Sequence, residues 1–219
     1  MLKAVLFDVD GTLVTFKFDA LGARGALLDE MRRLGLDTTA LSLSSSTQVI
    51  IDSARAQSRS RGGGGFAPIK ERLYSILDSF EEESSRDAVV FPETIRALEY
   101  LRGRSLRLGV LTNSGRKAAY PVLRRGGIFG FFEFVISRED VDAMKPSPEG
   151  ILLALERFDV DREDLCYVGD GLLDVAAAKA AGVRVVSVAT GTQPADRLRQ
   201  EGADVLIRSL DELPGAIGV

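Results

Sequence analysis

Short apolar runs that alternate with stretches of helical spacing constrain the fold of this chain more than any other feature of its sequence. The runs are typical of β-strands and lie at residues 2–7, 106–111, 134–136, 165–168, 183–188 and 204–207. Helical spacing runs from Pro92 through Leu98 and Leu101, and it recurs over residues 116–125, 148–158, 172–181 and 194–201. Strands that alternate with helices form βαβ units, in which helices cover both faces of a parallel sheet. The sequence therefore predicts an α/β fold built on a parallel sheet.

The segment from Thr15 to Phe91 interrupts this alternation, because it shows helical patterns but no convincing strand. Its apolar residues form two faces at helical spacing, one of Leu27, Leu28, Met31 and Leu34 and one of Ile69, Leu73, Ile76, Leu77 and Phe80. Residues 55–65 are polar, basic and glycine-rich, so we expect a mobile loop there. The sequence predicts a helical domain over residues 15–91, inserted into a core made of residues 1–14 and 92–219.

The composition excludes several kinds of active site. The 219 residues include no histidine, which excludes Ser-His-Asp triads, Cys-His nucleophiles and histidine-bound zinc. The single cysteine, Cys166, forms neither an internal disulfide nor a four-cysteine zinc site. A net charge of −4 gives no reason to expect a nucleic-acid partner. The sequence shows no signal peptide and no apolar run long enough to span a membrane, so we expect a cytoplasmic protein without a membrane partner.

Polar side chains follow three of the predicted strands at the point where each strand ends. They are Asp8 and Asp10 after the first strand, Thr112, Asn113 and Ser114 after the second, and Asp170 and Asp174 after the fourth, with Lys145 in a loop between. Ligands bind at the carboxyl ends of the strands in open α/β sheets, so we expect these side chains to meet at one edge. Clustered carboxylates favour a bound cation, and oxygen ligands without histidine or cysteine favour Mg²⁺.

The order of these segments resembles the haloacid dehalogenase superfamily, and specifically its phosphatases with a helical cap. The four stretches that match the family's motifs in order are LFDVDGTL at residues 6–13, LTNS at 111–114, KPSP at 145–148 and GDGLLD at 169–174. The first motif alone is moderately specific, but four in the correct order are strongly so. The resemblance covers the whole chain, and it implies a Rossmann-like core from residues 1–14 and 92–219 with residues 15–91 as an all-helical cap.

The resemblance also implies a role for each matched residue. Asp8 is the implied nucleophile, which attacks phosphorus and forms an aspartyl-phosphate. Asp10 is the implied general acid and base. The Thr112 hydroxyl and the Asn113 backbone N–H are the implied donors to the phosphoryl oxygens. Lys145 is implied to neutralise the charge on Asp8 and on the transferring group.

The implied cofactor is Mg²⁺, bound by Asp8, by the backbone carbonyl of Asp10 and by Asp170. Asp174 is implied to assist, either directly or through a water or Lys145. Asp10 also bears on the type of reaction, because the dehalogenases and transport ATPases of the superfamily have no acidic residue at this position. The resemblance therefore implies a Mg²⁺-dependent phosphatase that acts on a small phosphorylated metabolite, with phosphoglycolate as the first candidate.

Three other functions stay open at this point. A phosphomutase would share every core residue and would return the phosphoryl group to a sugar. A receiver-like regulatory domain also gathers aspartates and a lysine around Mg²⁺, although the chain length, the inserted segment and Asp10 argue against it. The third is a binding module without activity.

Two parts of the sequence leave the substrate and the assembly open. Gly171 stands where many relatives carry Ser or Thr, and residues 15–19 (TFKFD) depart from the continuation common in capped relatives. Arg55, Arg59 and Arg61 fit either a solvated basic loop or a surface that faces an anionic substrate, and Gly62–Gly65 lacks the spacing of a phosphate-binding loop. A monomer and a cap-mediated dimer are both compatible with the sequence.

Overall fold

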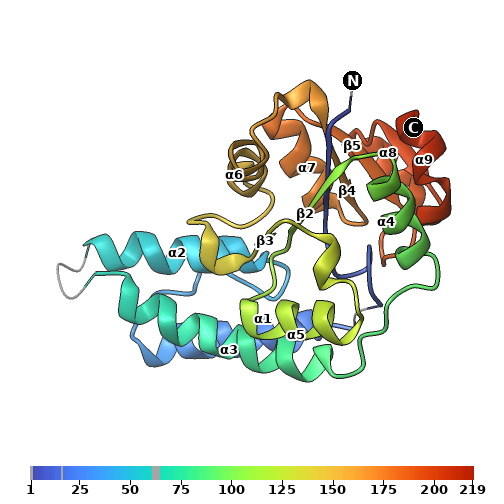
Figure 1. Cartoon of the computed structure of the whole chain (residues 1–219). Helices are drawn as coiled ribbons and strands as arrows, with labels where there is room; N and C mark the ends of the chain where they lie inside the picture. Colours follow the sequence, from blue (N-terminus) through green and yellow to red (C-terminus); the bar gives the residue numbers. More distant parts are fainter. Residues whose placement is uncertain (1, 16, 61–64) are drawn as a thin grey trace. The chain divides into compact units, whose positions relative to one another are not determined.

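A computed structural model describes residues 2–15, 17–60 and 65–219 (Figure 1). The chain forms two compact units. The larger comprises residues 1–16 and 87–219, and the smaller comprises residues 17–86. Within each unit the fold follows from the apolar patterns of the sequence, as described below.

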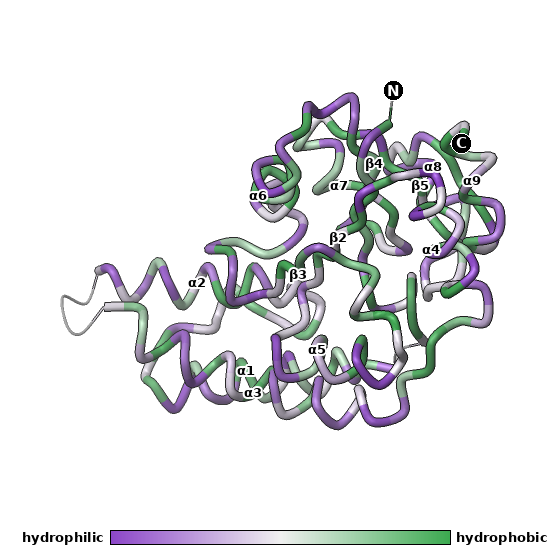
Figure 2. The backbone as a smooth tube through the Cα atoms, in the orientation of Figure 1, coloured by the Kyte–Doolittle hydropathy of each residue, from purple (hydrophilic) through white to green (hydrophobic). Residues whose placement is uncertain are grey.

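The larger unit is built on a six-stranded sheet in which every pairing is parallel. The strands are β1 (Ala4–Phe7), β2 (Arg107–Leu111), β3 (Val135–Ile136), β4 (Leu165–Gly169), β5 (Arg184–Val188) and β6 (Val205–Ile207). Their order in the sheet is β3-β2-β1-β4-β5-β6, so the first strand of the chain lies at the centre. Figure 2 shows that hydrophobic residues run along these central strands. Strands buried on both faces need such continuous apolar runs, which explains why they could be found in the sequence.

Helices of the larger unit cover both faces of the sheet. They are α4 (Thr94–Gly103), α5 (Arg116–Arg125), α6 (Glu149–Phe158), α7 (Leu172–Ala181), α8 (Ala195–Glu201) and α9 (Leu213–Ile217). Alternate residues of β1 point to opposite faces: Val5 and Phe7 belong to the core under α4, α5 and α9. Ala4 and Leu6 belong to the core under α6, α7 and α8.

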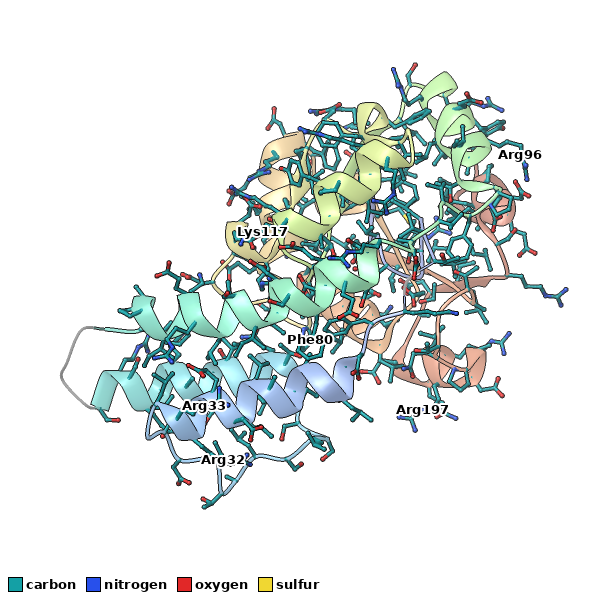
Figure 3. All side chains as sticks on the ribbon, turned by 90° about the horizontal axis from the view of Figure 1, so that it is seen from below. Arg32, Arg33, Phe80, Arg96, Lys117 and Arg197 are labelled. Carbon is teal, nitrogen blue, oxygen red and sulfur yellow. The ribbon has the colours of Figure 1, made fainter. Side chains whose placement is uncertain are left out.

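The smaller unit consists of the three helices α1 (Ala20–Arg33), α2 (Thr47–Ser60) and α3 (Ala67–Ser85). The Asp19 carboxylate caps α1 by accepting the Gly22 backbone N–H at 2.9 Å. All three helices contact one another through buried apolar residues such as Leu27 and Leu77. The ring of Phe80, labelled in Figure 3, approaches α1 beside Gly22, where a side chain would crowd it. The α/β fold with an inserted helical unit, predicted from the sequence, is thus confirmed.

One expectation for this unit was wrong. Residues 55–60 do not belong to a loop but form the second half of α2. The helix continues because Ile50, Ile51 and Ala54 bury one face at helical spacing, and Ser58 extends that buried face. Arg55 and Arg59 are therefore helical residues, whereas Arg61 and Gly62–Gly64 lie outside the described residues.

Among the helices that the structure describes, none combines the length and the apolar character that crossing a membrane requires.

Candidate active site

The predicted site residues lie together at the carboxyl edge of the sheet in the larger unit. β1 ends directly before Asp8 and is paired with β2 on one side and with β4 on the other. β2 therefore carries Thr112 to one side of Asp8, and β4 carries Asp170 to the other. The parallel arrangement thus gathers residues from distant parts of the chain, as expected for an open α/β sheet.

The Lys145 ammonium group lies at the centre of an acidic cluster formed by Asp8, Asp170 and Asp174. Its Nζ atom lies 2.7 Å from Asp8 Oδ1 and 2.6 Å from Asp174 Oδ1, and it donates to the Tyr167 hydroxyl at 3.1 Å. An ammonium group has three N–H donors, so these three acceptors satisfy it fully. All four side chains are buried. A buried charge is costly unless it is paired and hydrogen-bonded, and Lys145 meets both conditions.

Asp174 uses both of its carboxylate oxygens. Oδ1 accepts the Tyr167 hydroxyl at 2.8 Å in addition to Lys145, and Oδ2 accepts the Gly171 backbone N–H at 2.8 Å. Asp174 lies in the first turn of α7, where the helix dipole also favours a carboxylate. Its contact with Lys145 is direct, so the two groups are fixed relative to each other.

The Asn113 side chain joins the turn after β2 to the loop that carries Lys145. Its Oδ1 accepts the Lys145 backbone N–H at 2.9 Å, and its Nδ2 donates to the Lys145 carbonyl at 3.1 Å. A carboxamide has one acceptor oxygen and one donor NH₂ group, so it can bond to both the N–H and the carbonyl of the same residue. The pair of hydrogen bonds fixes the backbone of Lys145, while Asp8 and Asp174 fix its ammonium group.

Asp170 lies in a narrow space that two glycines leave open. A Cβ atom on Gly11 would lie 2.5 Å from Asp170 Oδ2, and one on Gly191 would overlap the same carboxylate. Gly11 also has a φ angle of +83°, which residues with a side chain rarely adopt. The Thr12 hydroxyl donates to Asp170 Oδ1 at 3.0 Å, and the Thr190 hydroxyl holds the Gly11 carbonyl at 2.6 Å. Backbone and hydroxyl groups thus position this carboxylate.

Asp10 contacts the turn after β2. The Ser114 hydroxyl lies 2.6 Å from Asp10 Oδ2, and the Ser114 backbone N–H donates to the Thr112 hydroxyl oxygen at 3.0 Å. Because Thr112 accepts with its oxygen there, its hydroxyl proton remains a donor. Thr112 is almost fully buried beside these groups.

The carboxylates of the cluster disfavour one another's charge. Burial raises the pKa of Asp8 well above its ordinary value, against the lowering effect of Lys145. Burial also raises the pKa of Asp10, against the hydrogen bonds from Ser114 and Thr112 and the charge of Lys145. Burial and the charge of Asp174 raise the pKa of Asp170 to about 7. Burial lowers the pKa of Lys145, but Asp174 and Asp8 outweigh it, so that pKa is raised and the residue stays cationic.

This cluster has the donor chemistry of a divalent metal site. One carboxylate oxygen from each of Asp8, Asp170 and Asp174 lies within 4.8 Å of the others. Lys145 is a single positive charge among three carboxylates, so it cannot compensate all of their negative charge. A hard divalent cation would do so, and carboxylate oxygens are the ligands that Mg²⁺ prefers. The residues present therefore fit Mg²⁺.

The burial of Asp170, together with the nearby charge of Asp174, predicts a pH-dependent stability for the metal-free protein. A folded-state pKa of about 7 for Asp170, against its ordinary 3.8, means that the folded protein holds this proton more tightly than the unfolded chain. The free energy of unfolding therefore falls as the pH rises from 3.8 to about 7. Above about pH 7, the stability stays at this lower value. In EDTA at pH 8, we expect Asp170→Asn to raise the free energy of unfolding in urea by roughly 2–4 kcal/mol, with little gain at pH 4.

The matched control for that experiment is Asp196→Asn, which removes an exposed carboxylate that pairs with Arg199 within α8. This variant should change the free energy of unfolding by less than about 1 kcal/mol at either pH. A loss of stability in Asp170→Asn at pH 8 would show that ionisation of the buried Asp170 carboxyl group does not destabilise the fold.

Sequence reasoning did not assign the roles of several residues that complete the cluster. Tyr167 bridges Lys145 and Asp174, Ser114 contacts Asp10, and Thr190 and Gly191 close the space around Asp170. Tyr167 had a detectable signal, since a tyrosine inside a buried apolar strand needs a partner for its hydroxyl. The sequence places Ser114 at the strand end but suggests no function for it.

Comparisons with known proteins agree with this arrangement. The family model of the haloacid dehalogenase-like hydrolases matches residues 2–182. The chain is 28% identical to a phosphoglycolate phosphatase of Nitrosospira multiformis, covering 96% of this chain and 93% of that protein. It is 29% identical to a phosphoglycolate phosphatase of Chromobacterium violaceum, covering 97% and 95%. Among solved structures, a hydrolase from Pseudomonas syringae shares the fold with a TM-score of 0.70 at 20% identity, covering 99% of both chains.

Proposed function

This chain belongs to the haloacid dehalogenase-like hydrolase family, and on that basis we propose that it is a phosphatase of small phosphate monoesters. The reaction proceeds through an aspartyl-phosphate on Asp8. The observation that carries this proposal is the position of Asp8, bound to Lys145 and close to Asp170 and Asp174, with a second carboxyl group two residues further along the chain.

Asp8 is proposed as the nucleophile. A carboxylate oxygen of Asp8 forms a bond to phosphorus, and the bond between phosphorus and the ester oxygen breaks. Burial removes water from this carboxylate, and the Lys145 ammonium group compensates its charge. The same ammonium group lies close enough to stabilise the negative charge on the transferring phosphoryl group.

Asp10 is proposed as the general acid and base. It gives its proton to the ester oxygen as the alcohol leaves, and it then takes a proton from the water that attacks the aspartyl-phosphate. That second step releases inorganic phosphate and restores the Asp8 carboxylate. The raised pKa of Asp10 supports this role, because an acid must hold its proton before the first step.

The turn after β2 is proposed to bind the phosphoryl oxygens. Thr112 offers its hydroxyl proton and Asn113 its backbone N–H, while the Asn113 side chain remains engaged with Lys145. Mg²⁺, bound by Asp8, Asp170 and the Asp10 carbonyl with Asp174 beside them, would neutralise the charge of the phosphoryl group. The helical unit is proposed as a cap over the leaving group, which would exclude bulk water during transfer.

Phosphoglycolate is the first substrate to test. The Nitrosospira and Chromobacterium relatives named above are phosphoglycolate phosphatases that align over nearly their whole length with this chain. This supports a small phosphorylated carboxylic acid as the substrate class. A sugar phosphate, as in a phosphomutase, is the second candidate.

We expect the protein to release phosphate from p-nitrophenyl phosphate with Mg²⁺ and to lose about 100-fold or more of that activity in EDTA, with recovery when Mg²⁺ is restored. This substrate has a good leaving group and makes few demands on the cap. Phosphoglycolate and a sugar 1-phosphate are then compared by their values of kcat/KM. If the folded protein releases no phosphate with any divalent cation, the phosphatase proposal is wrong; conversion of the sugar 1-phosphate without phosphate release would identify a mutase.

A further inference from the structure

The Ser114 hydroxyl contacts the Asp10 carboxyl group directly, and the mechanism above gives Ser114 no part. Its hydroxyl oxygen lies 2.6 Å from Asp10 Oδ2. The residue is 7% exposed, so water competes little for this contact. A hydrogen bond of this length between a hydroxyl and a carboxyl group is a strong one when the carboxyl group is ionised.

The backbone of Ser114 is anchored on both sides. Its N–H donates to the Thr112 hydroxyl oxygen at 3.0 Å, and its carbonyl accepts the Arg138 backbone N–H at 3.3 Å. Arg138 follows β3, so this turn is tied to the neighbouring strand as well as to its own. The Ser114 hydroxyl is therefore presented from a fixed backbone, and it can hold a partner in a fixed place.

We propose that Ser114 is a positioning residue for Asp10, which engages one carboxyl oxygen and leaves the other for proton transfer. The Ser114 hydroxyl donates to Oδ2 when Asp10 is ionised and also when the acidic proton of Asp10 is on Oδ1, so the contact persists in both protonation states. The proton given to the ester oxygen therefore leaves from Oδ1, the oxygen that Ser114 does not engage, and Oδ1 later takes a proton from the attacking water. This inference rests on the proposed function, in which Asp10 is the acid.

The test uses the dependence on the leaving group. An alkoxide is a poor leaving group and needs the proton from Asp10, whereas p-nitrophenolate leaves without it. We expect Ser114→Ala to lower kcat/KM for glycerol 2-phosphate about 10-fold and for p-nitrophenyl phosphate less than about 2-fold. Ser114→Thr, which keeps the hydroxyl, should restore the ratio of the two values. This ratio does not depend on the folded fraction of the enzyme, so a partly unfolded variant still gives an answer.

Two further variants separate the possible results. Ser137→Ala removes another buried serine hydroxyl, which bonds to Asp140 at 2.7 Å rather than to a site residue, and it should leave the ratio unchanged. Asp10→Asn should also lower kcat/KM for glycerol 2-phosphate more than for p-nitrophenyl phosphate, and the difference should be larger, on the order of 100-fold. If Asp10→Asn selectively lowers the activity on glycerol 2-phosphate and Ser114→Ala does not, the proposed role of Ser114 is wrong and the proposed function stands. If Asp10→Asn lowers kcat/KM for both substrates equally, both the acid role of Asp10 and the role of Ser114 are overturned.

Discussion

Replacing Asp8 with asparagine is expected to lower phosphate release from p-nitrophenyl phosphate by about 10⁴-fold or more. The carboxamide oxygen can still accept the hydrogen bond from Lys145, but it is a far weaker nucleophile and carries no charge. Because burial raises the pKa of the Asp8 carboxyl group, a neutral side chain of the same shape should not destabilise the fold. The measurement is the rate of phosphate release at saturating Mg²⁺, together with a thermal unfolding curve.

Asp211→Asn is the matched control for this prediction. Asp211 pairs with Arg96 on an exposed surface of the larger unit (Arg96 is labelled in Figure 3), so the variant removes the same charge away from the site. It should keep full activity. Asp8→Asn retaining more than about one part in a hundred of the wild-type rate would rule out Asp8 as the nucleophile.

Replacing Lys145 with methionine is expected to cause the second largest effect, on both stability and activity. Methionine leaves the buried carboxylates of Asp8 and Asp174 without their cation. In EDTA at pH 8, the free energy of unfolding in urea should fall by about 3–5 kcal/mol. At pH 5 the loss should be smaller, because the raised pKa of Asp8 lets that carboxyl group take up a proton. With Mg²⁺, activity should fall by about 10³-fold or more.

Two variants check the cause of that loss. Lys179→Met removes a lysine from an ion pair with Asp204 in which both side chains are exposed, and it should lower the free energy of unfolding by less than about 1 kcal/mol. Asp174→Asn added to Lys145→Met should recover part of the stability, because one of the two uncompensated charges is then gone. A loss that is equal at pH 5 and pH 8, and that Asp174→Asn does not reduce, would point to packing rather than charge.

The sequence was sufficient for those parts of the fold that depend on local pattern. β4 and α7 could be read because a buried strand and an alanine-rich helix each leave a continuous signal in the sequence. The second half of α2 could not, because polar and arginine residues cover its exposed face and four glycines follow it. Its buried face depends on contacts with α1 and α3, which no local window contains.

The candidate site likewise has residues that could be predicted from the sequence and contacts that could not. Asp8, Thr112 and Asp170 could be predicted because each follows a strand directly, and the topology of a parallel sheet then brings them to one edge. The hydrogen bond between Asn113 and Lys145, and that between Ser114 and Asp10, join segments 32 and 104 residues apart. Neither pairing has a signature in spacing, because side chains of many types fit a turn or a loop. Only the folded backbone shows which of them meet.

The central place of β1 in the sheet has a consequence for the synthesis of the protein. β1 pairs with residues 107–110 and 165–168, so it has no partner in the sheet until residues 107–110 have been made. The three helices of residues 17–86, by contrast, find their contacts within one short stretch. The acidic cluster is completed only when Asp174 has emerged, and a chain still shorter than that lacks the Lys145–Asp174 pair that holds Asp8. A chain made only as far as residue 173 should therefore lack the site that the proposed reaction requires.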